Sequence, residues 1–456
     1  MKMINSILAK NGSGRATVLA LLLTLMGGTV SRASDQIPAP PQKKPIALVG
    51  GTIHTITSGD IANGTIVFDK GKITAIGTNV TVPADAIRID ISGKHVYPSL
   101  IEGNSSLGLV EVRAVRATRD YAEVGSINPN VRPEVAINPD SEHFPVTRAN
   151  GVGLAVTRPT GGVIAGQMAF IMLDGWTWED MTLKAPVGMW INWPRMTVIS
   201  AWWMRQTPEQ QRKSMKKNLK RLEKAFEEAK AYMVAKEAAG AKGVPFHKFD
   251  ARWEAMIPVL KGELPVFIGA DEIKQIRAAV DFADRWKLKM VLVGGADAPL
   301  AADLLKRKNI PVVVTPVLRL PSRRDADFDA PFTLPKKLYD AGIPFCIAGG
   351  SRMGNERNLP YHAAKAAAYG LPREEALKAI TLYAAQIFGV ADRVGSLEVG
   401  KDASLFVADG DPLEIPTQVE MLFLQGRKVD LNNKHKTLYL KYKEKYRQKK
   451  AESAGE

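Results

Sequence analysis

Two different hydrophobic patterns divide the chain. Short runs rich in β-branched residues, separated by Gly, Asp and Asn, fill residues 45–98 and return in residues 394–432. Such runs are typical of antiparallel strands joined by tight turns, and Asp-Lys-Gly-Lys at residues 69–72 predicts a hairpin. We therefore expect one small β-domain, a composite β-sandwich, built from both ends of the chain.

Residues 99–393 show a different pattern, in which strand-like and helix-like segments alternate. Four apolar runs end in small residues near Gly269, Gly294, Thr315 and Gly350, and each predicts a buried parallel strand. The segments between them place apolar residues at helical spacing. This order predicts an α/β fold with a (β/α)8 TIM-type barrel, whose functional side chains lie at the carboxyl ends of the strands. A doubly wound sheet is the alternative.

Two earlier runs, residues 151–159 and 163–173, predict further strands of the same body. A long amphipathic helix is expected to follow them. Thr207 suits its N-cap, Pro208 its first position and Gln210 the reciprocal position of a capping box. The charge-rich face of this helix is expected to be solvated, with contact to a partner subunit as the alternative.

The N-terminal segment has the pattern of a secretory signal. In residues 1–33, Lys2, Lys10 and Arg15 precede an apolar run that ends in small residues. A polar, Pro-rich leader follows over residues 34–44. No later run approaches the length of a membrane span, so we expect an exported, periplasmic mature chain without a transmembrane helix. A retained N-terminal anchor is the alternative.

Composition narrows the class of protein. The 456 residues are 45% hydrophobic and 24% charged, which is typical of a globular chain and excludes collagen, coiled coil and disorder. Cys346 is the single cysteine, so an intrachain disulfide and a cysteine-based zinc site are excluded. The net charge of +15 comes partly from a basic tail over residues 433–456. We expect that tail to be a solvated helix, and nucleic acid is not an expected partner.

Six of the eight tryptophans lie between Trp176 and Trp203. Such a density fits packing over the barrel or contact with another subunit, and it therefore favours an oligomer. A ligand surface made of indole rings is the alternative.

Two segments of the chain also resemble motifs of a known protein family. Residues 93–109, "GKHVYPSLIEGNSSLGL", contain an apolar strand after a turn, and residues 359–413 contain "ALKAITLYAAQIFGVADRVGSLEVGKDASLFVADGDPL". Both are similar to the amidohydrolase superfamily of the imidazolonepropionase-like kind. The first matches the entry to that family's barrel, where a Pro-Gly turn leads to His-x-His. The resemblance implies a barrel with a composite β-domain and metal-dependent hydrolysis of carbon–nitrogen bonds.

The residues at the implied metal positions depart from the family. His-x-His falls on Asn104 and Ser106, two further histidine strands offer Gly269 and Gly294, and the catalytic Asp position falls on Gly350. A catalytic zinc needs about three nitrogen or oxygen donors, and glycine has no side chain to offer. The chain therefore resembles a secreted subgroup with degenerate metal motifs. The histidines that stay candidate ligands are the loop residues His143 and His247.

The barrel mouth is nevertheless a candidate site for a small anionic ligand. Arg113, Arg116 and Arg119 recur at three-residue spacing and would align their guanidinium groups if this segment were helical. Arginine binds carboxylate or phosphate through paired donors. The strand pattern places further polar candidates near the same rim: Asp271, Arg352 and Asn355, with Asn104 and Ser106.

These observations lead to one reading and one alternative. The leading hypothesis is an exported, amidohydrolase-like protein that binds a ligand or partner, needs no cofactor and has lost hydrolysis. Its partner would be a second copy or a related amidohydrolase-like subunit. The alternative is an active hydrolase of carbon–nitrogen bonds, such as cyclic amides, that uses a displaced zinc or other divalent metal site or a metal-independent mechanism.

Overall fold

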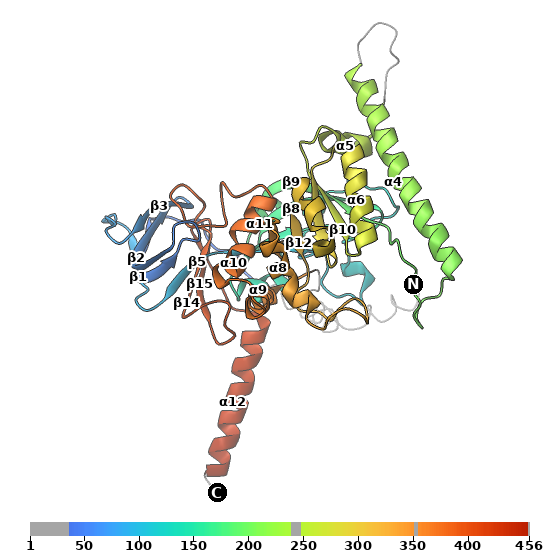
Figure 1. Cartoon of the computed structure of the whole chain (residues 1–456). Helices are drawn as coiled ribbons and strands as arrows, with labels where there is room; N and C mark the ends of the chain where they lie inside the picture. The colour runs from blue at the N-terminus through green and yellow to red at the C-terminus, as the bar shows by residue number, and fades with distance from the viewer. Residues whose placement is uncertain (1–35, 239–247, 351–353, 455–456) are drawn as a thin grey trace, which may run out of the picture. The chain divides into compact units, whose positions relative to one another are not determined.

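The computed structural model describes residues 36–238, 248–350 and 354–454. The predicted signal segment, residues 1–33, lies outside the described residues. Pro38–Glu456 form one compact unit. Its strands form two sheets (Figure 1).

The first sheet is the predicted composite domain, because both ends of the chain contribute to it. Its order is β16-β15-β14-β5-β1-β2-β3, with β4 paired to β1. The two ends meet where β5 and β14 pair antiparallel, with Tyr97 opposite Phe406. The strands are β1 (Ile46–His54), β2 (Asp60–Asp69), β3 (Lys72–Gly77), β4 (Ile87–Asp90), β5 (His95–Pro98), β14 (Leu405–Ala408), β15 (Val419–Leu424) and β16 (Arg427–Val429).

The predicted hairpin at residues 69–72 joins β2 to β3. Lys70 and Gly71 both have positive φ angles, 48° and 80°, which is the geometry of the tight turn preferred between twisted antiparallel strands. The core of this sheet also mixes the two ends of the chain, since Phe68 packs edge-on against Phe423 at a centroid distance of 5.1 Å.

The second sheet is the barrel, with the order β13-β12-β11-β10-β9-β8-β7-β6. Its first and last members, β6 and β13, also contact each other. The apolar runs predicted as strands are all present. The strands are β6 (Leu100–Ser105), β7 (Val152–Thr157), β8 (Ile164–Met172), β9 (Thr182–Asn192), β10 (Val266–Ala270), β11 (Met290–Gly294), β12 (Val312–Val314) and β13 (Phe345–Ile347).

One strand departs from the regular repeat of a (β/α)8 barrel. β8 runs antiparallel to both β7 and β9, whereas the other neighbouring pairs of this sheet are parallel. The link between β7 and β8 covers only residues 158–163. A parallel crossover needs roughly a dozen residues or more, so the chain turns back instead. β9 was also not predicted, because it lies inside the tryptophan-rich segment.

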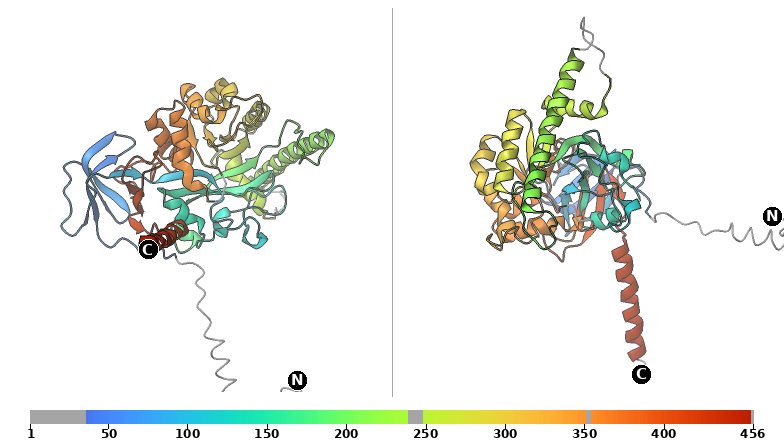
Figure 2. Two further views of the ribbon diagram at one scale, coloured as in Figure 1. Left: turned by 90° about the horizontal axis from the view of Figure 1, so that it is seen from below. Right: turned by 90° about the vertical axis from the view of Figure 1, so that its right-hand side faces the viewer.

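Helices lie outside the barrel sheet, as the two views of Figure 2 show for α4 (Pro208–Glu237). The capping box of α4 forms as predicted: Thr207 accepts from the amide of Gln210, and the Gln210 side chain accepts from the amide of Thr207. None of the described helices is both long and apolar enough to cross a membrane. The others are α2 (His143–Arg148), α3 (Trp178–Met181), α5 (Ala251–Leu260), α6 (Ile273–Arg285), α7 (Ala302–Arg307), α8 (Ala330–Asp340), α9 (Leu359–Ala368), α10 (Arg373–Ala379), α11 (Leu382–Ile387) and α12 (Lys434–Ala454), with short 3-10 turns η1 (Arg116–Thr118), η2 (Pro133–Ala136), η3 (Ala298–Ala301) and η4 (Glu356–Asn358).

Candidate functional site at the barrel mouth

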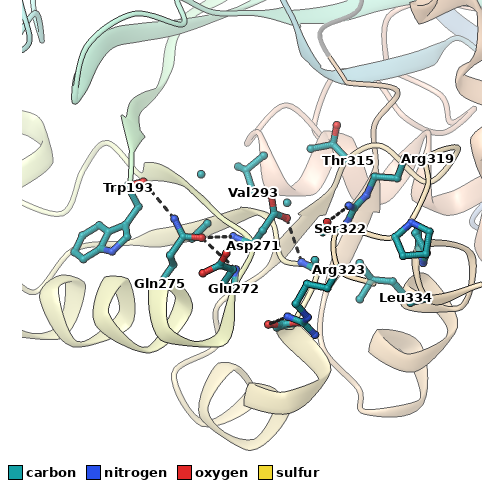
Figure 3. Close-up of a pocket in the computed structure, with 18 of the residues that line it drawn as sticks. Trp193, Asp271, Glu272, Gln275, Val293, Thr315, Arg319, Ser322, Arg323 and Leu334 are labelled. Atoms are coloured by element: carbon teal, nitrogen blue, oxygen red, sulfur yellow. Dashed lines mark hydrogen bonds and ion pairs between the residues drawn. The ribbon is translucent and has the colours of Figure 1, made fainter. Parts of the chain in front are cut away.

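The carboxyl ends of the barrel strands surround a cavity of about 500 Å³. Its lining comes from β6, β9, β10 and β11, from the segments that follow β7, β9, β10, β11 and β12, and from α6 and α8. This is where barrels of this kind place their functional side chains. Figure 3 shows part of the wall, with Asp271, Arg319 and Arg323 among the labelled residues. The lining arginines are Arg158, Arg195, Arg319 and Arg323.

Arg158, directly after β7, is a buried cation with only 7% of its surface exposed. Its guanidinium carbon lies 3.5 Å from the centroid of the Trp190 ring. Nε donates to Oδ1 of Asn104 at 2.6 Å, and Nη1 donates to the carbonyl of Pro159 at 3.1 Å. Burial lowers the pKa of Arg158 to about 9, so the group still carries its charge at neutral pH.

Asn104 and Trp190, which contact Arg158, are each oriented by a further hydrogen bond. The amide nitrogen of Asn104, Nδ2, donates to Oγ1 of Thr315 at 3.2 Å, which turns the amide oxygen toward Arg158. The indole N–H of Trp190 donates to Oδ1 of Asn192 at 2.9 Å, which fixes the ring plane. Because both supports are oriented by further hydrogen bonds, the position of the guanidinium is set by the barrel itself.

Gly269 makes room for this arrangement. A Cβ atom at Gly269 would lie 3.2 Å from Cζ2 of Trp190. A side chain as large as histidine would therefore need the indole ring to move. Since that ring supports the guanidinium of Arg158, the glycine at position 269 and the buried cation belong to one arrangement.

Two further glycines at strand ends are crowded in the same way. Gly294 has a φ of +96°, and a Cβ there would lie 2.6 Å from Oδ1 of Asp271. Gly350 has a φ of +81°, and its Cβ would lie 2.8 Å from Oγ1 of Thr315. A side chain at either position would be strained in its backbone and would displace a polar neighbour. Side chains of the cavity thus fill the space next to these glycines.

The carboxylates of the cavity have partners other than Arg158. Asp297 accepts two hydrogen bonds from Nη1 of Arg323, at 2.9 and 2.7 Å. Glu272 accepts a hydrogen bond from the Thr197 hydroxyl at 2.5 Å. Burial raises the pKa of Asp271 above its ordinary value. Asp271 accepts the backbone N–H of Ala296 at 3.3 Å. The acidic groups are therefore engaged within the wall of the cavity rather than with its most buried arginine.

A buried carboxyl group lies beside Asn104. Glu102 on β6 accepts the backbone N–H of Asn104 at 3.0 Å and that of Gly349 at 2.8 Å. Burial, reinforced by the nearby charge of Glu356, raises the pKa of Glu102 to about 8. The neutral acid is therefore the main form of Glu102 in the folded protein at pH 7.

His362, on α9, uses its ring to bind backbone. Its Nδ1 accepts the N–H groups of Val317 and Leu318, both at 3.1 Å. The His362 ring thus binds the backbone of the segment that follows β12. In the described ranges, 36–238, 248–350 and 354–454, no three His, Cys, Asp or Glu side chains are grouped so that they could hold a metal ion.

The structure brings several of the predicted positions together. Asn104, Gly269, Gly294 and Asp271 all line the cavity. Ser106 is buried just after β6 but is not part of the lining. The sequence pattern predicts that the strand ends converge, and in the structure residues from three strands surround one cavity.

The arginine-rich segment differs from its expected geometry. Residues 116–118 form a short 3-10 turn rather than a longer helix, because the Thr118 hydroxyl bonds the carbonyls of Val112 and Val115 and folds the segment back. The guanidinium groups are thus not aligned along a helix face, and none of them lines the cavity. The three arginines concerned are Arg113, Arg116 and Arg119.

The remaining candidates are also away from the cavity lining. Asn355 is exposed just before η4. His143 opens α2, where its Nε2 lies 3.0 Å from the carbonyl oxygen of Glu111. Arg352 and His247 lie outside the described residues.

Sequence reasoning missed the residues that dominate the site, namely Arg158 and Trp190. A signal was present: Arg158 lies at the carboxyl end of the predicted strand at residues 151–159, the same kind of strand end as Gly269. Trp190 and Trp193 line the cavity, so part of the tryptophan-rich segment belongs to the barrel mouth. Packing over the barrel or subunit contact was the favoured expectation for that segment.

A barrel with a composite sheet and a cavity at the strand ends is typical of a class of hydrolase-like proteins. Comparison with known proteins shows which family of that class the chain resembles. The profile of the amidohydrolase family matches residues 334–433. The amidohydrolase tasK of Hapsidospora irregularis is 23% identical over 401 residues, which are 80% of this chain. These matches support assignment of the chain to the amidohydrolase superfamily. It spans only 39% of the length of that relative.

Solved structures extend the similarity over the fold. An amidohydrolase from Thermotoga maritima MSB8 is 26% identical with a TM-score of 0.76, and the match covers 84% of this chain and 99% of that one. A prolidase complexed with N-methylphosphonate-L-proline is 17% identical with a TM-score of 0.52, over 85% of this chain and 100% of that one. The second match shows a shared fold.

Proposed function

We propose that this chain is a metal-independent, ligand-binding member of the amidohydrolase superfamily that lacks the family's hydrolysis. The observation that carries the proposal is the guanidinium of Arg158, which lies 3.5 Å from the Trp190 centroid in the barrel-mouth cavity. A fixed positive side chain in this cavity would repel a dication through Coulombic interaction in a low dielectric.

The side chains available as metal ligands also support a cavity without a metal ion. A zinc site needs about three N, O or S ligands at roughly 2.0–2.3 Å. The positions implied by the family resemblance supply an amide at Asn104 and no side chain at Gly269 or Gly294. The Asn104 oxygen already accepts a hydrogen bond from Arg158. The residues present do not fit a catalytic metal.

Metal analysis of the purified chain after dialysis tests this function. The proposal expects no stoichiometric divalent ion. One zinc or manganese ion per chain, together with hydrolysis of a cyclic amide that a chelator abolishes and the ion restores, would establish the active hydrolase instead. Export, removal of residues 1–33 and assembly with a second or related subunit stay predictions from the sequence.

A further inference from the structure

Arg158 has unused hydrogen-bonding capacity at the cavity. A guanidinium carries five N–H donors, and the interactions of Arg158 within the described residues use Nε and Nη1. Its two protein acceptors, Asn104 and the Pro159 carbonyl, are neutral. No carboxylate of the described residues lies within 4.0 Å of it. A buried charge without a counter-charge is unfavourable, and an anionic ligand would remove that deficit.

The rest of the cavity selects the kind of anion. Four arginines and three carboxylates line this space, a formal surplus of one positive charge. That surplus is neutralised by a monoanion, whereas a multiply charged anion such as phosphate would carry excess negative charge beside Asp271, Glu272 and Asp297. A carboxylate carries one charge and matches a guanidinium with two parallel hydrogen bonds. The geometry therefore favours a monocarboxylate over phosphate.

The cavity also offers apolar surface for the body of such a ligand. Trp193 from the segment after β9, and Pro331 and Leu334 from α8, belong to its wall. A volume of about 500 Å³ lies within the range of small-molecule sites. A short acid with an aromatic or aliphatic body fits both the polar and the apolar parts of this lining.

We propose that Arg158 is the anchoring residue for the carboxylate of a small apolar monocarboxylic acid bound at the barrel mouth. The inference rests on the proposed function, because it assumes a cavity that holds no metal. Arg158 replaces Arg113, Arg116 and Arg119 as the candidate anion-binding residue.

Calorimetric titration with matched probes tests this anchor. The full mature chain, dialysed against a chelator, is titrated with acetate, benzoate and 3-phenylpropionate and with the corresponding neutral amides. A charge-assisted contact predicts that at least one acid binds about 10- to 100-fold more tightly than its amide. Inorganic phosphate is expected to bind more weakly than that acid.

Variants assign the preference to one side chain. Arg158→Gln is expected to abolish the preference for acid over amide, and Arg158→Lys to keep only part of it, because lysine lacks the planar pair of donors. Arg113→Gln, a change to an exposed arginine outside the cavity lining, is expected to keep all of it. If Arg158→Gln does not fold, the partial loss of preference expected of Arg158→Lys decides the question, and an unchanged preference in Arg158→Lys would overturn the anchor.

The outcomes separate the two proposals. Equal binding of acids and amides, binding of no acid, or a preference that survives Arg158→Gln would overturn the anchor while leaving a metal-free chain unaffected. Binding that the chelator abolishes and zinc restores would instead overturn the proposed function.

Discussion

The C-terminal family segment, residues 334–433, and the strand ends around the cavity differ in what their residues do. In the family segment, side chains such as Ala366, Ala384 and Phe388 are fully buried and pack helices and strands together. At the strand ends, by contrast, glycines with positive φ angles and polar groups face one another. The first region maintains the barrel and the second determines what the barrel can bind.

The contrast teaches that fold and chemistry are separable within one barrel. Close packing penalises changes of volume throughout the scaffold, whereas chemistry depends on a few side chains at the mouth. A chain can therefore keep the scaffold of the superfamily while Arg158 and Trp190 occupy the cavity in which relatives would place different groups. The following predictions test this division.

The largest effect is expected in the scaffold. Phe388 is buried and stacks on Phe267 at a centroid distance of 5.1 Å. Phe388→Ala is expected to lower the free energy of unfolding by about 3–5 kcal/mol, because it leaves a cavity in the core. Urea denaturation measures this loss. Phe328→Ala, at a residue that is 74% exposed, is the matched control, and equal losses in both variants would refute the assignment of Phe388 to the core.

The next effect concerns pH and lies at the edge of the cavity. The pKa of Glu102 is raised from 4.5 to about 8 in the folded chain, so the folded state holds the proton more tightly than the unfolded state. Its contribution to stability is therefore fully present below about pH 4.5 and is lost as the pH rises through about 8. From pH 5 to pH 8 this loss is on the order of a few kcal/mol.

Glu102→Gln isolates that loss, because an amide does not titrate. The variant lacks one acceptor for the two backbone N–H groups, which shifts its stability at every pH, so the readout is the slope and not the offset. Denaturation at pH 5, 6, 7 and 8 is expected to give a smaller fall in the variant. Glu356, also buried with a raised pKa, titrates in both proteins. Parallel curves would show that Glu102 is ionised in the folded state.

The smallest effect compares two glycines with similar backbone angles. Gly294→Ala and Gly400→Ala both place a methyl group at a positive φ, +96° and +92°, which destabilises each by about 1–2 kcal/mol. Only Gly294 has a crowding neighbour, Oδ1 of Asp271, whereas Gly400 has nothing within 4 Å. Overpacking adds roughly 1–3 kcal/mol for Gly294→Ala. Equal thermal shifts in the two variants would contradict the crowding.

Much of the fold follows from local signals in the sequence. The cap at Thr207 and the hairpin at residues 69–72 depend on neighbouring residues alone, so the sequence predicts them correctly. The direction of β8 depends on the short link at residues 158–163 and on pairing with both neighbours. An apolar run has the same periodicity in either direction, which is why a regular parallel repeat was expected there.

The site was less accessible from the sequence than the fold. Strand-end reasoning located Asn104, Gly269, Gly294 and Asp271 at one cavity, because parallel strands share an edge. It could not tell that Arg158 turns inward onto Trp190, since that contact joins residues 32 positions apart in the chain. The regular spacing of Arg113, Arg116 and Arg119 suggested a helical binding face. Their segment is instead a loop, whose conformation depends on the hydrogen bonds of the Thr118 hydroxyl.

Anomalous X-ray diffraction at the zinc edge, from crystals grown with excess zinc, tests the central claim most directly. No anomalous peak is expected in the barrel-mouth cavity, and the guanidinium of Arg158 is expected to stack on Trp190. A peak in that cavity with three protein ligands at about 2.0–2.3 Å, and Arg158 displaced from the indole, would contradict that claim.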